Sequence, residues 1–67
     1  MPLSEALVLF RRLGVQVEAM SPSDFTLAYF ALAKRYHPDR NPKGHDMMAN
    51  INAARATLLK SYREPMP

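Results

Sequence analysis

Apolar side chains recur every three or four residues in three stretches of this 67-residue chain, which is the spacing of one face of an α-helix. Residues 3–13 form the first stretch. Gly14 follows it, where helices commonly end in a residue of positive φ, and Arg11 and Arg12 complement the negative end of the helix dipole. The face predicted to point inward carries Leu3, Ala6, Leu7, Phe10 and Leu13.

The second stretch, residues 22–36, begins with strong helix signals and ends at a proline. Ser21 is suited to cap the helix, Pro22 to occupy its first position and Asp24 to lie in its first turn. Pro38 stops the pattern because the residue before a proline disfavours helical backbone. The predicted core face consists of Phe25, Ala28, Leu32 and Tyr36, with Tyr29 at its edge.

The opposite face of this second helix is unusually apolar. At about 100° per residue, Leu27, Phe30, Ala31 and Lys34 all lie away from the core face, which predicts two large apolar side chains in solvent. Scattered apolar residues are common on protein surfaces. The sharper hypothesis is that Leu27 and Phe30 form a docking surface for a second polypeptide.

The third stretch, residues 45–62, predicts the longest helix. One side carries Met48, Ile51, Leu58, Leu59 and Tyr62. Arg55 falls in the middle of that apolar arc, where a ring or a leucine is the simpler expectation; its stem can pack while the guanidinium reaches water. Met20, Met47 and Met48 are expected to fill gaps in the core.

Residues 37–44 join the second and third helices and contain two prolines and a glycine, the composition of a surface loop. Short connections favour antiparallel neighbours, so the two helices should form a hairpin with this loop at its tip. The predicted fold class is therefore all-α, a single domain over residues 1–67. In it a shorter first helix packs against the hairpin.

Composition restricts the function further. The chain has no cysteine, which excludes disulfides, thiol chemistry and cysteine zinc fingers, and its size leaves room for only a thin core. An enclosed active site does not fit, and no activated nucleophile or phosphate-binding glycine loop is found, so we expect an interaction module and not an enzyme.

The net charge of +3 is dispersed along the chain and forms no basic block. No leader or membrane-spanning run is seen in this sequence, which predicts a cytoplasmic location.

The residues that carry candidate chemistry are His37, Pro38 and Asp39 in the loop. Pro38 fixes its own φ and favours an extended His37, so the imidazole and the Asp39 carboxylate should be presented at a defined angle. Such a carboxylate is a ready acceptor for a bidentate arginine of a partner. The cations close enough to engage acidic groups around that arginine are Lys34, Arg35 and Arg40.

These residues occur in a recognisable setting. Residues 32–42 read LAKRYHPDRNP; Ala28-Tyr29 precedes them, and Ile51-Asn52-Ala53-Ala54 follows. With Leu13-Gly14-Val15 at the end of the first helix, the chain resembles a J-domain, the co-chaperone module of the DnaJ family. The likeness extends from about Leu7 to Leu59.

The resemblance implies a partner, an ATP-bound DnaK-class chaperone of the seventy-kilodalton heat-shock type, which the domain would bind through the His-Pro-Asp loop and the second helix and whose ATP hydrolysis it would stimulate. It also implies that Asp39 pairs with an arginine of that chaperone while His37 and Pro38 order the contact. The chain itself would need no cofactor and would act as a monomer. The flanking contacts would come from Tyr29, Lys34, Arg35, Arg40 and Asn41.

The chain also departs from the family. Basic residues usually stand just before and after the tyrosine of the second helix, where this sequence has Thr26, Leu27, Phe30 and Ala31. The Ala-Tyr of the third helix is replaced by Ala54-Arg55. The basic fourth helix is expected to be absent or vestigial, and the client-binding regions are missing from this sequence.

Three other interpretations remain open. The loop could be merely solvated, or it could hold a metal ion through His37, Asp39, His45 and Asp46. A degenerate J-like scaffold could dock another protein through Leu27 and Phe30. A small basic domain could also bind nucleic acid, although the loop is too long for a helix-turn-helix. The phosphate contacts of such a domain would come from Arg11, Arg12, Lys34, Arg35, Arg40, Lys43 and Arg55.

Overall fold

The computed structural model describes residues 1–63, and the side chains of residues 1–61. Its helices are α1 (Leu3–Arg12), the single-turn 3-10 helix η1 (Val17–Ala19), α2 (Pro22–Arg35) and α3 (Gly44–Arg63). The prediction of an all-α fold is confirmed. Tyr62, expected on the core face of α3, and the region of a possible fourth helix lie outside the described side chains and residues.

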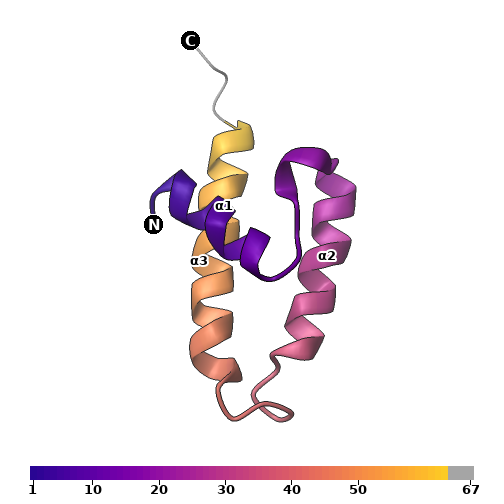
Figure 1. Cartoon of the computed structure of the whole chain (residues 1–67), viewed down its shortest axis with the longest axis vertical. Coiled ribbons are helices and arrows are strands. Elements are labelled where there is room, and N and C mark those ends of the chain that lie inside the picture. Colours follow the sequence, from indigo (N-terminus) through magenta and orange to yellow (C-terminus); the bar gives the residue numbers. More distant parts are fainter. Residues whose placement is uncertain (64–67) are drawn as a thin grey trace.

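Helices α2 and α3 run antiparallel, and α1 crosses the face of α3 (Figure 1). The chain leaves α1, passes through η1 beside the start of α2, and returns along α2 to the loop at the far end of the hairpin. This loop lies at the end of the molecule, away from the N-terminus and from η1. The loop therefore lies at one end of the hairpin, whereas α1 and η1 pack nearer the other end.

Local sequence signals explain where the helices begin and end. Ser21 Oγ accepts a hydrogen bond from the Asp24 backbone N–H at 3.1 Å, and Pro22 occupies the first turn of α2. Gly14 has a φ of +85°, so α1 is followed by the left-handed glycine that the sequence predicts. Helix α3 begins at Gly44, which belongs to the helix and not to the loop.

The core is small and draws on all the elements. Phe10 of α1 meets Phe25 of α2 edge to face, with ring centroids 5.1 Å apart and an interplanar angle of 84°. Met20, Met47 and Met48 pack against the core as half-buried side chains, as predicted. The buried apolar residues are Ala6, Phe10, Val15, Val17, Phe25, Leu32, Ile51, Ala54 and Leu58.

Two features differ from the sequence analysis. Leu3, predicted to face inward, is the first residue of α1 and is 42% exposed. Val15 and Val17 are buried although they lie outside the long helices. Helical periodicity identifies the inward face of a helix, but it does not show how much of that face the other helices cover. It also does not show how the segment between two helices packs against the core.

No helix in the described range combines the length and the apolar character needed to cross a membrane.

Candidate partner-binding site

The loop between α2 and α3 is held by its own backbone. The N–H groups of Arg40 and Asn41 both donate to the carbonyl oxygen of His37, at 2.9 and 3.0 Å. Asn41 then accepts twice, through its side-chain oxygen from the Lys43 N–H at 3.0 Å and through its carbonyl from the Gly44 N–H at 2.8 Å. Half-buried Asn41 thus links the turn to the start of α3, a role inside the loop that the sequence did not indicate.

Gly44 determines how closely the two ends of the loop approach. It is buried, and a Cβ atom at this position would overlap the carbonyl oxygen of Tyr36 and lie 2.8 Å from its carbonyl carbon. The same Cβ would be 3.1 Å from the carbonyl carbon of His37. Only glycine allows the first residue of α3 to pack against the end of α2. Sequence reasoning overlooked this residue, and the only signal was a glycine next to a predicted helix start.

His37 and Asp39 form the exposed part of the turn. The Asp39 backbone N–H donates to His37 Nδ1 at 3.2 Å. His37 Nδ1 also lies 3.6 Å from Asp39 Oδ2. The Asp39 side chain is 89% exposed, and both its oxygens remain accessible to a partner.

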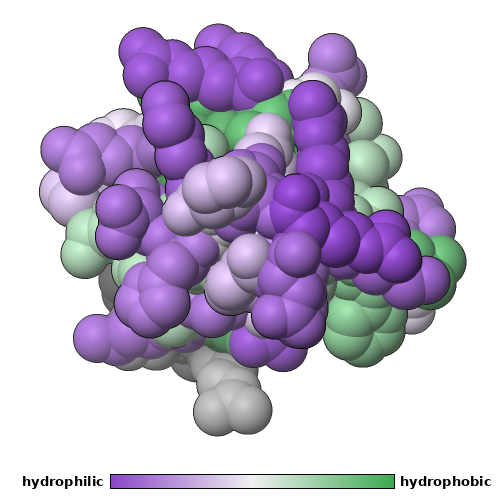
Figure 2. Space-filling model, turned by 90° about the horizontal axis from the view of Figure 1, so that it is seen from below, coloured by the Kyte–Doolittle hydropathy of each residue, from purple (hydrophilic) through white to green (hydrophobic). Residues whose placement is uncertain are grey.

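Two of the three predicted cations lie beside this carboxylate, and the third lies at the base of the loop. Lys34 and Arg40 line an open hollow together with His37 and Asp39. The Arg35 guanidinium lies over the ring of Tyr36, 5.3 Å from its centroid, which orients Arg35 at the base of the loop. Seen from the loop end, the surface is predominantly hydrophilic (Figure 2). The sequence-predicted residues Lys34, His37, Asp39 and Arg40 are therefore neighbours in space.

Tyr29 is placed differently from these residues. Its hydroxyl donates to Asn52 Oδ1 of α3 at 2.6 Å, and the Arg55 guanidinium lies 4.8 Å from the centroid of its ring. We call Tyr29, Asn52 and Arg55 the interhelix clasp. Arg55 fits its apolar surroundings because it covers the tyrosine ring, a cation–π contact that periodicity alone does not reveal. Half-buried Tyr29 joins the two helices and does not lie at the tip.

The outward face of α2 is apolar, as the sequence predicts. Leu27 is 66% exposed and Phe30 is 54% exposed. Figure 2 shows apolar surface at its right-hand edge, the side on which α2 lies in Figure 1.

The alternative sites receive little support from the arrangement. Within residues 1–63, no three or more histidine and carboxylate side chains come together as metal ligands would. The basic residues considered for nucleic acid are distributed over several parts of the fold: Arg11 lies 3.7 Å from Glu18 of η1, Arg55 covers the ring of Tyr29, and Lys34 and Arg40 line the hollow at the tip.

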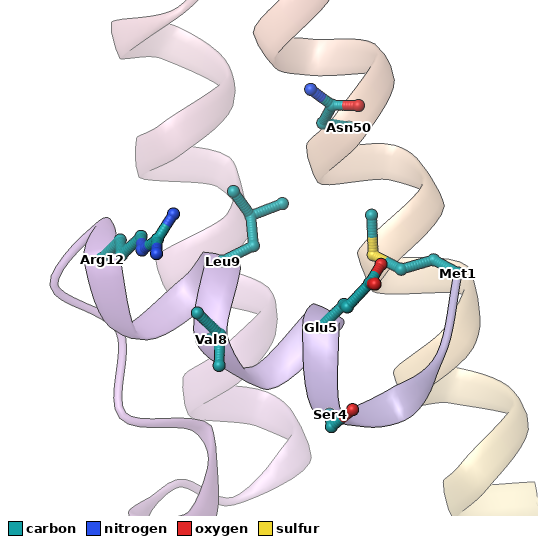
Figure 3. A pocket seen from close by; sticks show the side chains of 7 residues that line it. All are labelled: Met1, Ser4, Glu5, Val8, Leu9, Arg12 and Asn50. Carbon is teal, nitrogen blue, oxygen red and sulfur yellow. The ribbon is translucent and has the colours of Figure 1, made fainter.

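Another hollow in the described part of the chain lies between α1 and α3 (Figure 3). It has a volume of about 470 Å³, and all its lining residues except Asn50 come from the N-terminal segment and α1. None of the residues predicted for chaperone binding lines it. The lining comprises Met1, Ser4, Glu5, Val8, Leu9, Arg12 and Asn50.

A three-helix domain whose antiparallel pair presents an exposed His-Pro-Asp turn has the architecture of a J-domain co-chaperone module. The family model for the DnaJ domain matches residues 9–64, and the chain belongs to this family. Two relatives named Chaperone protein DnaJ, from Mycoplasma capricolum subsp. capricolum and Mycoplasma mycoides subsp. mycoides, are each 49% identical over 49 residues. The matched segment covers 70% of this chain but 13% of either relative. No solved structure gives a significant match.

Proposed function

We propose that this J-domain binds a DnaK-class chaperone through the His37-Pro38-Asp39 turn and stimulates that chaperone's ATP hydrolysis. The observation that carries the proposal is the Asp39 carboxylate. It is 89% exposed, and it stands on a turn fixed by hydrogen bonds to the His37 carbonyl.

A fixed carboxylate suits recognition of an arginine. The planar guanidinium can donate two parallel hydrogen bonds to both carboxylate oxygens, and such pairs are among the stronger polar contacts in proteins. Because the turn is already ordered by backbone hydrogen bonds, its backbone loses little conformational entropy on binding. Lys34 and Arg40 border the same hollow, so acidic side chains around the partner's arginine would meet positive charge.

His37 and Pro38 restrict the backbone conformation at Asp39. Pro38 restricts the backbone between the two polar residues, and His37 Nδ1 accepts the Asp39 N–H at 3.2 Å. The imidazole therefore holds the backbone of the residue whose carboxylate makes the contact. In this mechanism the chemistry of ATP hydrolysis belongs to the partner, and the chain contributes binding energy to the partner's active conformation.

Single-turnover ATP hydrolysis by a purified DnaK-class chaperone tests the proposal. Asp39→Asn keeps the size of the side chain but removes its charge, and His37→Gln removes the imidazole. Each should lower stimulation more than tenfold, because a desolvated charge pair at an interface is commonly worth about 2 kcal/mol or more. Both residues are exposed, so helical circular dichroism and melting temperature should change little.

Asp24→Asn provides the matched control. Asp24 is also exposed, but it lies in the first turn of α2, at the opposite end of the hairpin. This variant should stimulate like the wild type. Stimulation that survives both Asp39→Asn and His37→Gln would refute the proposed mechanism.

A further inference from the structure

The outward face of α2 carries a stripe of exposed side chains with the spacing of a helix-packing seam. Its members follow one another at intervals of four, three and four residues, which keeps them in one narrow arc of the helix surface. In Figure 1, α2 forms one side of the molecule, and no other element of the described chain lies beyond it. We call these residues the α2 stripe; they are Ser23, Leu27, Phe30 and Lys34, all exposed.

The order of side chains along the α2 stripe is self-complementary. If two copies of α2 cross antiparallel at the midpoint between Leu27 and Phe30, each Leu27 meets the Phe30 of the other copy. At 1.5 Å per residue, Asp24 of one copy then lies within about 1.5 Å, measured along the axis, of Lys34 of the other. A parallel pair would instead bring the two Lys34 side chains together. The sequence of the stripe therefore favours the antiparallel arrangement.

The charge on this face permits a second copy to approach. The chain carries a net charge of +3, but between Pro22 and Ala33 its only formal charge is that of Asp24. Together, Asp24 and Lys34 make the face neutral, with the negative group near one end and the positive group near the other. An antiparallel pair converts this distribution into an attraction at each end of the contact.

The contacts around Phe30 provide a supported aromatic side chain at the centre of the stripe. Its ring centroid lies 6.0 Å from that of Tyr29, with the two planes tilted by 52°. Tyr29 is itself held by Asn52 and Arg55 of α3. Phe30 is 54% exposed and its neighbour Leu27 is 66% exposed, so both still have apolar surface to bury. Aromatic side chains at the centre of a contact are enriched among the residues that dominate interface energetics.

We infer that two copies of this chain associate through their α2 stripes, as an antiparallel pair related by a two-fold axis. The resemblance to the family implies a monomer, whereas the apolar stripe of this chain provides a surface for its own copy. Each copy contributes one helix face, and interfaces at the small end of the size range are weak and transient. We therefore expect a dissociation constant on the order of 100 µM, so that the chain is almost entirely monomeric at low micromolar concentration.

Sedimentation equilibrium of the purified chain, from about 10 µM to about 1 mM, tests the association. The weight-average mass should rise with concentration from 7.6 kDa toward twice that value. Leu27→Ala/Phe30→Ala should raise the dissociation constant at least about tenfold, because the two-fold axis repeats each lost contact. Alanine favours helix and both side chains are exposed, so the helical circular-dichroism signal should persist.

Leu3→Ala/Val8→Ala is the matched control. Leu3 and Val8 are also apolar and exposed, at 42% each, but they belong to α1. This variant should keep the wild-type dissociation constant.

A charge reversal tests the antiparallel arrangement. Lys34→Asp places carboxylates opposite each other at both ends of the contact, and should weaken association about three- to tenfold at low salt. Adding Asp24→Lys restores opposite charges, and the dissociation constant of Asp24→Lys/Lys34→Asp should return to within about twofold of the wild-type value.

The results of these measurements decide the inference. A wild-type chain that remains at 7.6 kDa up to about 1 mM overturns it and leaves the α2 stripe to a different polypeptide. Association that persists in Leu27→Ala/Phe30→Ala, or that is lost in the α1 variant, assigns the contact to another surface and also overturns it. Failure of the double charge reversal to restore association contradicts the antiparallel pairing. Selective loss in the stripe variants, with rescue by the reversal, supports the dimer.

Discussion

At the scale of single residues, Gly44 and Gly14 are required for different reasons. Gly14 adopts a φ of +85°, and no atom lies within 4 Å of a Cβ built there, so its requirement is conformational. Gly44 has no such backbone constraint, but a Cβ would collide with the Tyr36 carbonyl. The first glycine ends a helix, whereas the second lets α3 start against the end of α2 and so shapes the loop.

The steric requirement predicts that Gly44→Ala destabilises the domain. The obstructing atoms are backbone, which cannot rotate away, so the junction must shift at a cost of about 1–3 kcal/mol. For a domain of this size the melting temperature should fall by at least about 4 °C in a thermal scan. Gly14→Asn is the contrasting variant, because asparagine tolerates a positive φ, and it should melt closer to the wild type. A wild-type melting temperature for Gly44→Ala would contradict the close approach.

At the scale of elements, α2 and α3 are joined by polar contacts as well as by the core. The interhelix clasp combines the hydrogen bond from Tyr29 to Asn52, at 2.6 Å, with Arg55 over the same ring. A separate hydrogen bond farther along α3 joins it to the N-terminus, where the Thr57 hydroxyl donates to the carbonyl oxygen of Met1 at 3.0 Å. The clasp joins the two helices that carry the tip, and therefore contributes to the relative placement of the two ends of the loop.

A double-mutant cycle between Tyr29→Phe and Asn52→Ala should isolate the clasp hydrogen bond. We expect a coupling free energy of about 0.5–1 kcal/mol from denaturant unfolding, because both groups can bond to water when separated. Tyr29→Phe combined with Thr57→Val is the control pair, since Thr57 bonds to the carbonyls of Met1 and Ala53 and shares no partner with Tyr29. Additive effects in the Tyr29–Asn52 cycle would show that the hydrogen bond contributes nothing to the pairing of the helices.

At the scale of the whole molecule, stability depends on very few side chains. The largest fully buried residues are Phe10, Phe25 and Ile51, one from each long helix. A domain of this size has a total stability of roughly 3–10 kcal/mol. Removing one large core side chain therefore consumes a substantial fraction of that stability, whereas the tip and the outward face of α2 can change without affecting it.

Phe10→Ala should consequently unfold most of the domain. Truncating a buried phenylalanine costs about 3–5 kcal/mol, and here it also removes the edge-to-face contact with Phe25. The helical circular-dichroism signal at 25 °C should be largely lost, or the melting temperature should fall by about 20 °C or more. Phe30→Ala is the matched control, since the same change at a 54% exposed position should alter stability by only about 0.5 kcal/mol. Comparable losses in both variants would contradict the assignment of the core.

The sequence by itself determined the helices and the chemistry of the tip. Periodic apolar residues, the Ser21 cap and Gly14 are local signals that act within a few residues, so they can be read without knowing the fold. Exposure of Leu27 and Phe30 also followed from the period of one helix. His37 and Asp39 were recognised because they are adjacent in the chain.

Tertiary structure alone decided the contacts between elements. The steric need for Gly44, the burial of Val15 and Val17, and the exposure of Leu3 all depend on where a neighbouring segment runs. The hydrogen bond of the clasp joins Tyr29 and Asn52, which are 23 positions apart in the sequence. The arginine at position 55 is explained by its contact with the Tyr29 ring, which belongs to another helix. Such pairings arise from the packing of separate helices, whose relative placement is not encoded in the period of any one of them.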